Sequence, residues 1–135
     1  MRACVAVTVG VLLLTPVSPA RSQPAAGVDW SAVLPINVLL IDDKFVPDHL
    51  TFRHGVPNQL HLEHHGKDLH EFTAPEFFGA SVLRNVGQLA NSAHEIVVQA
   101  GTAVDVDVMP LRPGTYKLIC ADHDWDGMMG EITVE

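Results

Sequence analysis

One short loop near the C-terminus constrains this chain more than any other stretch. Cys120, His123 and Met128 lie within nine consecutive residues. The runs on either side, residues 114–119 and 129–134, are rich in the β-branched and aromatic residues typical of strands. The sequence therefore predicts two strands joined by a loop that carries a thiol, an imidazole and a thioether.

These three side chains favour a metal site, and copper in particular. Thiolate and thioether are soft ligands, and imidazole also suits copper. Zinc sites use Cys, His and carboxylates but not a thioether, and covalent haem would require a second Cys three residues before Cys120 and a His directly after it. In the ordinary alternative, Cys120 and Met128 only fill the core and His123 lies at the surface. Because all three residues occur together at this spacing, we favour the metal site.

The loop resembles the C-terminal copper loop of plastocyanins and pseudoazurins, which belong to the cupredoxin family. In that loop the pattern G-x-Y-x-x-x-C-x-x-H-x-x-x-x-M-x-G-x-[IV]-x-V is typical. The matching residues here are Gly114, Tyr116, Cys120, His123, Met128, Gly130, Ile132 and Val134. The resemblance runs from about Phe45 to Val134, and residues 68–72 look like the family's segment with the first His, which is His70 here.

The resemblance implies the fold, the metal and the ligand set. The expected fold is all-β, a Greek-key cupredoxin β-sandwich with one short helical insertion. The expected cofactor is one type 1 copper ion, held by His70, Cys120 and His123 as strong ligands and Met128 as a weak axial ligand. Met129 is the competitor at the axial position, and we expect it to pack inward instead.

Two functions follow from such a site. The first is a mobile carrier of single electrons between redox partners through Cu(I)/Cu(II). It is not an enzyme, because a fully ligated copper has no open position for a substrate. The alternative is a periplasmic protein for copper delivery, storage or resistance. A nucleophilic Cys–His enzyme is a poor third reading, because no orienting Asn or Asp constellation is evident.

Glu71 departs from the family pattern. Plastocyanins and azurins usually have Asn directly after the first His, and that Asn helps to tie the site together by hydrogen bonds. A Glu at this position either changes the surroundings of the metal or points to solvent, as Glu usually does. The sequence leaves both readings open.

The N-terminus has the form of a secretory signal peptide. A positive start is followed by an apolar stretch to Leu14 and by small residues at 18–20, and this stretch is too short for a spanning helix. We expect a signal peptide over 1–20, a flexible leader over 21–33 and a cupredoxin domain over 34–135. Cleavage would remove Cys4 and leave Cys120 as the only cysteine. The mature protein is then expected in the periplasm without membrane insertion; an uncleaved anchor is the alternative.

The mature chain is strongly acidic. Beyond residue 20 it has 16 Asp and Glu against seven Lys and Arg, a formal charge of −9. This balance argues against nucleic acid and anionic membranes as partners. It favours a basic redox protein such as a c-type cytochrome, or else a terminal reductase or oxidase. Trp125, flanked by Asp122, Asp124 and Asp126, either docks such a partner or packs locally with the Asp residues as loop formers.

Hydrophobic alternation predicts the strands. Leu60 and Leu62 are expected to face inward, and within 104–108 three Val are expected inward and two Asp outward. Pro47 fits an edge strand or a bend within 45–52.

Residues 73–92 break the β pattern, and the Ala-Pro-Glu at 74–76 predicts a helix start. The side chains expected on one face of this helix are Phe77, Phe78, Val82, Leu83 and Val86.

Six further histidines invite a second metal site: His49, His54, His61, His64, His65 and His94. Their spacing is loose, so we interpret them as solvated surface residues.

Overall fold

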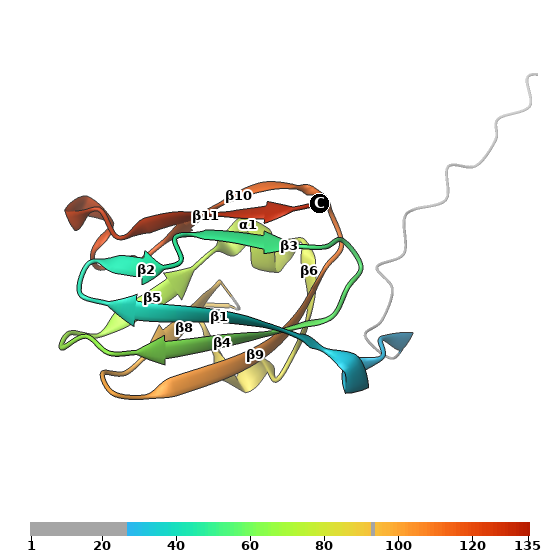
Figure 1. Ribbon diagram of the computed structural model, residues 1–135, viewed down its shortest axis with the longest axis horizontal. Helices are drawn as coiled ribbons and strands as arrows, with labels where there is room; N and C mark the ends of the chain where they lie inside the picture. Colours follow the sequence, from blue (N-terminus) through green and yellow to red (C-terminus); the bar gives the residue numbers. More distant parts are fainter. Residues whose placement is uncertain (1–26, 93) are drawn as a thin grey trace, which may run out of the picture.

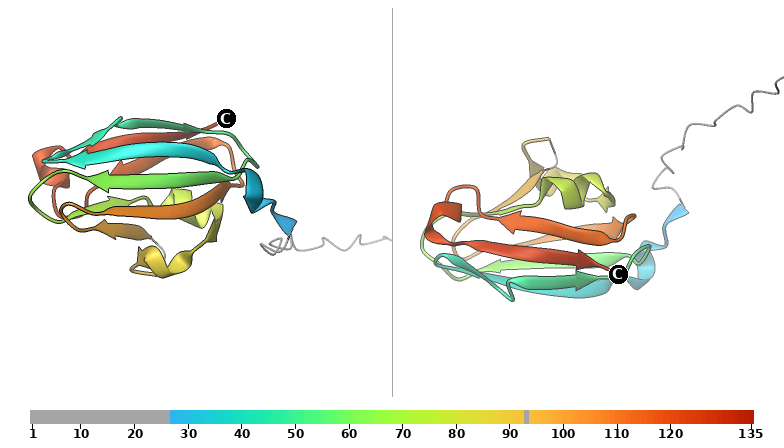
Figure 2. Two further views of the ribbon diagram at one scale, coloured as in Figure 1. Left: turned by 60° about the horizontal axis from the view of Figure 1, so that its bottom comes forward. Right: turned by 90° about the horizontal axis from the view of Figure 1, so that it is seen from above.

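The computed structural model describes residues 27–92 and 94–135. The predicted signal peptide and residues 21–26 of the predicted leader lie outside these described residues. In the described part, two β-sheets face each other (Figures 1 and 2). The predicted all-β sandwich is therefore confirmed.

The first sheet has five strands in the order β2 (Lys44–Val46), β1 (Leu34–Ile41), β4 (Asn58–His64), β9 (Ala103–Pro110) and β6 (Ser81–Arg84). The second sheet has six strands in the order β3 (His49–Phe52), β11 (Met129–Val134), β10 (Gly114–Ile119), β5 (His70–Thr73), β8 (Glu95–Val98) and β7 (Leu89–Ala90). The other elements are the helix α1 (Pro75–Gly79) and the short 3-10 helices Trp30–Ala32, Val86–Gln88 and Asp124–Asp126.

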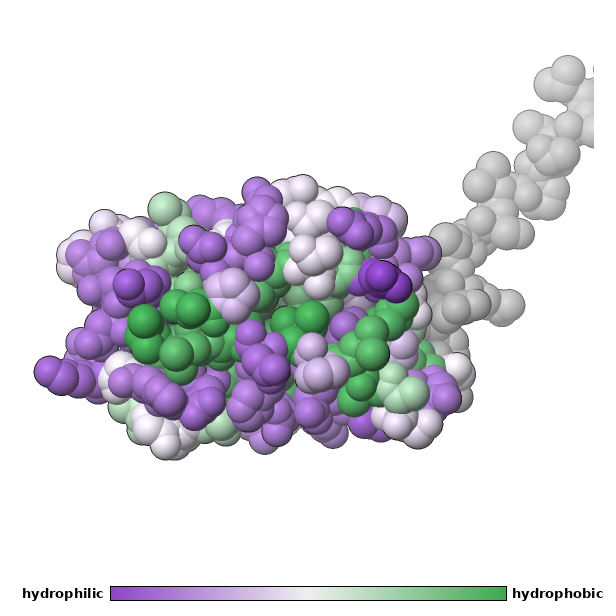
Figure 3. Space-filling view, in the orientation of Figure 1, coloured by the Kyte–Doolittle hydropathy of each residue, from purple (hydrophilic) through white to green (hydrophobic). Residues whose placement is uncertain are grey.

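Alternating apolar side chains from both sheets form the core. Leu60 and Leu62 are fully buried, as predicted, and so are Val106 and Val108 of the neighbouring strand β9. The face of the sandwich that carries β1 is hydrophilic around its rim, with apolar residues gathered along its middle (Figure 3).

Pro47 separates two strands that belong to different sheets. β2 is an edge strand of the first sheet, and β3 is an edge strand of the second. Since proline has no N–H to donate to a ladder, the strand cannot continue regularly through this position. The predicted bend is confirmed, and the chain crosses from one sheet to the other there.

The predicted helix is shorter than expected. Phe77 and Phe78 are buried in α1, but the helix ends at Gly79. The assignment of Val82 and Leu83 to its apolar face is wrong, because they lie in β6, where they pair with β9. The backbone at Val86 begins a separate 3-10 helix. Residues 81–84 instead pair with β9 at the edge of the first sheet. The hydrophobic pattern of residues 73–92 could not reveal this pairing, because β9 lies far away in the sequence.

One of the two Asp residues of β9 also differs from its prediction. Asp105 is exposed, but Asp107 is only 1% exposed. Arg84 donates to the Oδ2 of Asp107 from Nε at 2.8 Å and from Nη2 at 2.6 Å, and Asn85 donates to the same oxygen. Asp107 is covered because β6 brings a guanidinium beside it, so its charge is compensated rather than solvated.

Candidate metal centre

The sandwich brings four predicted ligands to one of its ends. Cys120 directly follows β10, His123 lies in the next loop, and Met128 directly precedes β11. His70 begins β5, which pairs with the end of β10 through Thr73 and Ile119. Figures 1 and 2 show the β10–β11 loop at the same end as the loop before β5. His70 therefore reaches the loop from a different strand.

Three of the ligand atoms face one another. The metal-binding atoms of His70, Cys120 and His123 all lie within 4.8 Å of one another. The Sγ of Cys120 lies 3.4 Å from Nδ1 of His123 and 3.8 Å from Nδ1 of His70, and the two Nδ1 atoms are 3.3 Å apart. Three ligands bound at roughly 2.0–2.3 Å in one plane would stand about 3.5–4 Å apart. The residues present therefore fit a trigonal two-His, one-Cys set, which is the blue-copper arrangement.

Met128 ends the loop that begins at Cys120. Its side chain is fully buried in the same core cluster as Cys120. The backbone N–H of Cys120 donates to the Met128 carbonyl at 3.0 Å, and the N–H of Met128 donates to the His123 carbonyl at 3.1 Å. Met129, in contrast, is 49% exposed, so the expectation that it packs inward is wrong. The strand alternation that begins at Met128 turns the next side chain to the surface, and Met128 keeps its place as the predicted axial ligand.

Glu71 faces the site and does not point to solvent, the two alternatives that the sequence left open. Its side chain is only 7% exposed. The Cys120 thiol donates to Oε2 of Glu71 at 3.3 Å, and the Asp122 N–H donates to the same oxygen at 3.2 Å. The backbone N–H of Glu71 in turn donates to Sγ of Cys120 at 3.4 Å. Glu71 thus ties β5 to the loop through both its backbone and its side chain.

Burial shifts the pKa values of two ligands. It raises the pKa of the Cys120 thiol; the backbone N–H groups of Glu71 and Asp122 oppose this rise, whereas the hydrogen bond and charge of the Glu71 carboxylate add to it. Burial also lowers the pKa of the His70 imidazole, and the neighbouring His64 and His123 lower it further. Without a metal, both groups are therefore held in their neutral forms.

These shifts predict a window of maximal stability for the metal-free protein. The lowered pKa of His70 contributes stability above its ordinary value of 6.5, and that stability is lost as the pH falls. The raised pKa of Cys120 contributes stability below its ordinary value of 9.0, and that stability is lost as the pH rises. Urea unfolding of the metal-free protein should give its highest midpoint between these values. In Cys120→Ser the urea midpoint should fall less steeply as the pH rises above 9.0. An unchanged fall would contradict the assignment of this loss of stability to the Cys120 thiol.

His64 is a residue of this region that the sequence reading missed. The interpretation of His64 as a solvated surface residue is wrong: it is fully buried, and neither ring nitrogen has a hydrogen-bond partner. Its ring packs edge-on against that of His70, with centroids 4.7 Å apart. The signal was present in the sequence, because His64 continues the inward period of Leu60 and Leu62.

The surface histidines do not form a second cluster. His61 pairs with Asp105 at 2.7 Å, and His65 pairs with Glu63 at 2.6 Å. Within residues 27–92 and 94–135, the trio of His70, Cys120 and His123 is the only group of three or more His, Cys, Asp or Glu whose ligand atoms converge.

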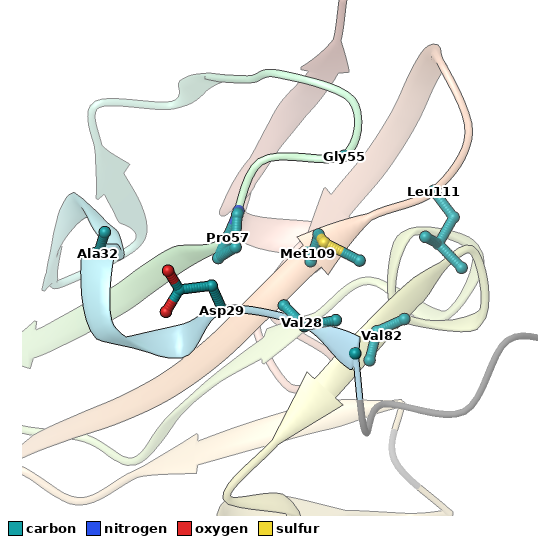
Figure 4. A pocket seen from close by; sticks show the side chains of 9 residues that line it. Val28, Asp29, Ala32, Gly55, Pro57, Val82, Met109 and Leu111 are labelled. Carbon is teal, nitrogen blue, oxygen red and sulfur yellow. The ribbon is translucent and has the colours of Figure 1, made fainter.

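A large cavity lies at the opposite end of the sandwich. It has a volume of about 730 Å³ and is lined mainly by apolar residues, among them Val28, Val82, Met109 and Leu111 (Figure 4). The charged residue in its wall, Asp29, accepts hydrogen bonds from the N–H and the hydroxyl of Ser31. None of His70, Cys120, His123 and Met128 lines this cavity, so it takes no part in the site.

Solved structures share the fold. Auracyanin B is 18% identical, with a TM-score of 0.60 over 80% of this chain and 93% of that protein. Dithionite-reduced auracyanin from Roseiflexus castenholzii is 16% identical, with a TM-score of 0.58 over 78% of this chain and 99% of that protein. At these identities the likeness establishes the fold alone. A search of curated protein sequences gives no match.

Two findings complete the comparison. In the described residues no helix is long and apolar enough to cross a membrane. The family model of the cupredoxin-like domain matches residues 5–134, nearly the whole chain. The chain therefore belongs to the cupredoxin-like domain family.

Proposed function

We propose that this protein is a type 1 copper protein of the periplasm that carries single electrons between redox partners. The observation that carries the proposal is the convergence of two imidazole nitrogens and one thiol sulfur within 4.8 Å, in a chain of the cupredoxin-like domain family. Bound copper would supply a one-electron Cu(I)/Cu(II) couple. His70, Cys120 and His123 would hold it, with Met128 as the weak axial ligand.

The protein's own contribution is to hold the ligands in place before and after electron transfer. Cys120 is fixed at the end of β10, and its sulfur accepts the Glu71 N–H. His70 is fixed at the start of β5 and is 1% exposed. Because the end of β10 and the start of β5 anchor these two ligands, we expect little atomic movement on a change of copper charge, which would favour fast electron transfer. His123 is only partly buried and gives the site its route to the surface.

The same arrangement argues against catalysis at the metal. With His70, Cys120, His123 and Met128 all holding the copper, no open position would remain for a substrate. Cys120 and Met128 are fully buried, so the site is closed on its inner side.

Copper loading tests the proposal. The mature protein titrated with Cu(II) should develop an intense thiolate-to-copper absorption band that saturates at one equivalent. Its electron paramagnetic resonance spectrum should show a narrow copper hyperfine splitting. Repeated reduction and reoxidation should restore the band without loss of metal. A pale complex with wide hyperfine splitting would contradict the proposal.

Copper delivery is the alternative function, and metal exchange separates it from electron transfer. A delivery protein should surrender Cu(I) readily to a competing chelator, whereas a carrier should retain it through many redox cycles. Full burial of Cys120 and Met128 favours retention. Rapid loss of Cu(I) under mild competition would favour delivery.

The acidic loop around His123 is proposed as the docking surface for a basic redox protein. Trp125 is 78% exposed, so the reading in which its ring packs locally does not hold. Its indole N–H donates to the Asp122 carbonyl at 2.9 Å, which orients the ring at the surface. An exposed aromatic side chain among three acidic residues suits a partner with a basic rim.

Removal of the three negative charges of this loop should slow the association of the protein with a basic redox partner. A variant with Asn at 122, 124 and 126 is expected to be reduced by a basic c-type cytochrome about tenfold more slowly at low salt, because charge complementarity raises association rates. The difference should vanish at high salt. The control removes three acidic charges elsewhere: Glu76→Gln, Asp105→Asn and Glu135→Gln. Equal slowing in both variants would show a net-charge effect rather than docking at the loop.

A further inference from the structure

The carboxylate of Glu71 is unusual because it lies against the sulfur ligand itself. Oε2 of Glu71 is 3.3 Å from Sγ of Cys120, and the side chain is almost completely buried. A buried carboxylate normally has a cationic partner. The ion pairs between described residues involve other acids and leave Glu71 without one. Its hydrogen-bond donors are the Asp122 N–H and the Cys120 thiol.

Metal binding would remove one of these donors. A cysteine binds metal as the thiolate, so its proton leaves when the metal enters. The carboxylate of Glu71 then retains the Asp122 N–H and faces the sulfur without the S–H bond. An anionic oxygen would thus stand beside an anionic ligand in a low-dielectric interior, where charge interactions are strong.

We propose that Glu71 is a positioning residue that lowers the reduction potential of the copper site through its charge. This proposal rests on the copper site proposed above. Reduction adds one electron to the site, and the neighbouring negative charge opposes that addition. The oxidised state is therefore favoured relative to a site in which a neutral amide occupies the same position. The second role of Glu71, holding the loop through the Asp122 N–H, does not require a charge.

The variant Glu71→Gln separates these two roles. Gln has nearly the same shape and keeps a carbonyl oxygen to accept the Asp122 N–H, but it carries no charge. We expect the equilibrium between the reduced and oxidised forms to shift about tenfold toward the reduced form, the lower end of the 10–100-fold range that such partners have on metal affinity or activity. For a one-electron couple this equals a rise of about 59 mV in midpoint potential.

Three further variants make the test specific. Glu71→Asp keeps the charge and should leave the potential nearer to that of the wild type than Glu71→Gln does. Glu95→Gln removes another largely buried carboxylate of the same sheet, one that is bonded to Thr73 and Asn91 rather than to a ligand. It should leave the potential nearly unchanged. Glu71→Asn is a second neutral variant in case Glu71→Gln does not fold, which thermal unfolding of each metal-free variant would show.

The measurement is the midpoint potential by spectroelectrochemical titration, with the position of the thiolate-to-copper band as a second readout. A higher potential in the neutral Glu71 variants alone supports the proposal. An intact band with an unchanged potential in those variants overturns it and leaves the electron-carrier function standing. An equal rise in Glu71→Asp or Glu95→Gln also overturns it, because the effect would not be the local charge. Absence of the band in every protein, including the wild type, overturns both proposals.

Discussion

Replacement of Cys120 by Ser is expected to abolish the thiolate-to-copper band and to weaken Cu(II) binding by more than about 100-fold. Removal of partners outside the ligand set already costs 10–100-fold in metal affinity, and this variant removes a strong ligand. A hydroxyl does not replace a thiolate for copper, because the soft sulfur supplies much of the binding. The side chain is fully buried, so no other soft donor of the surface can take its place.

The fold should survive this substitution. Ser is slightly smaller than Cys, and its hydroxyl can donate to the Glu71 carboxylate as the thiol does. Circular dichroism and thermal unfolding of the metal-free variant should therefore resemble those of the wild type. His61→Asn is the control for a surface histidine outside the ligand set and should retain the band. A band that persists in Cys120→Ser would mean that Cys120 does not bind Cu(II), and metal delivery would then move ahead of electron transfer.

Gly130→Ala is expected to lower the free energy of unfolding by about 1–3 kcal/mol, the usual range for overpacking. A Cβ at this position would clash with the Asp48 carbonyl oxygen, well inside van der Waals contact, and would stand 3.2 Å from Cδ2 of Leu118. The first neighbour is backbone, so it cannot move aside as a flexible side chain would. β3 would have to shift away from β11, and the hydrogen bond from the Glu131 N–H to the Asp48 carbonyl, 2.8 Å long, would be strained.

The effect should reach the metal site, because Gly130 lies two residues after Met128 at the start of β11. We expect the variant to bind copper more weakly and with a broader spectrum than the wild type. Gly79→Ala is the matched control, since a Cβ there meets nothing within 4 Å. It should leave the urea midpoint unchanged or raise it slightly, as Ala favours helix over Gly. Equal midpoints for the two variants would show that the approach of Asp48 to Gly130 is not a tight contact.

Features that depend on residues close together in the chain could be predicted from the sequence. Cys120, His123 and Met128 share one loop, so their spacing alone predicted a copper-type ligand set. Period-two alternation correctly placed Leu60 and Leu62 in the core. Pro47 marked a bend because the missing N–H is a property of the residue itself.

Contacts between residues far apart in the chain became visible only in the three-dimensional structure. Glu71 and Cys120 are separated by 49 positions, so only the pairing of β5 with β10 shows that the carboxylate meets the thiol. His64 looked like part of a polar loop, yet it ends β4 and packs on His70. Val82 left the predicted helix because β9 offered a strand partner. Long-range packing sets which side chains are buried and which side chains they contact, and it therefore sets the surroundings of the site. The ligand residues of the C-terminal loop could be recognised from their types and spacing alone.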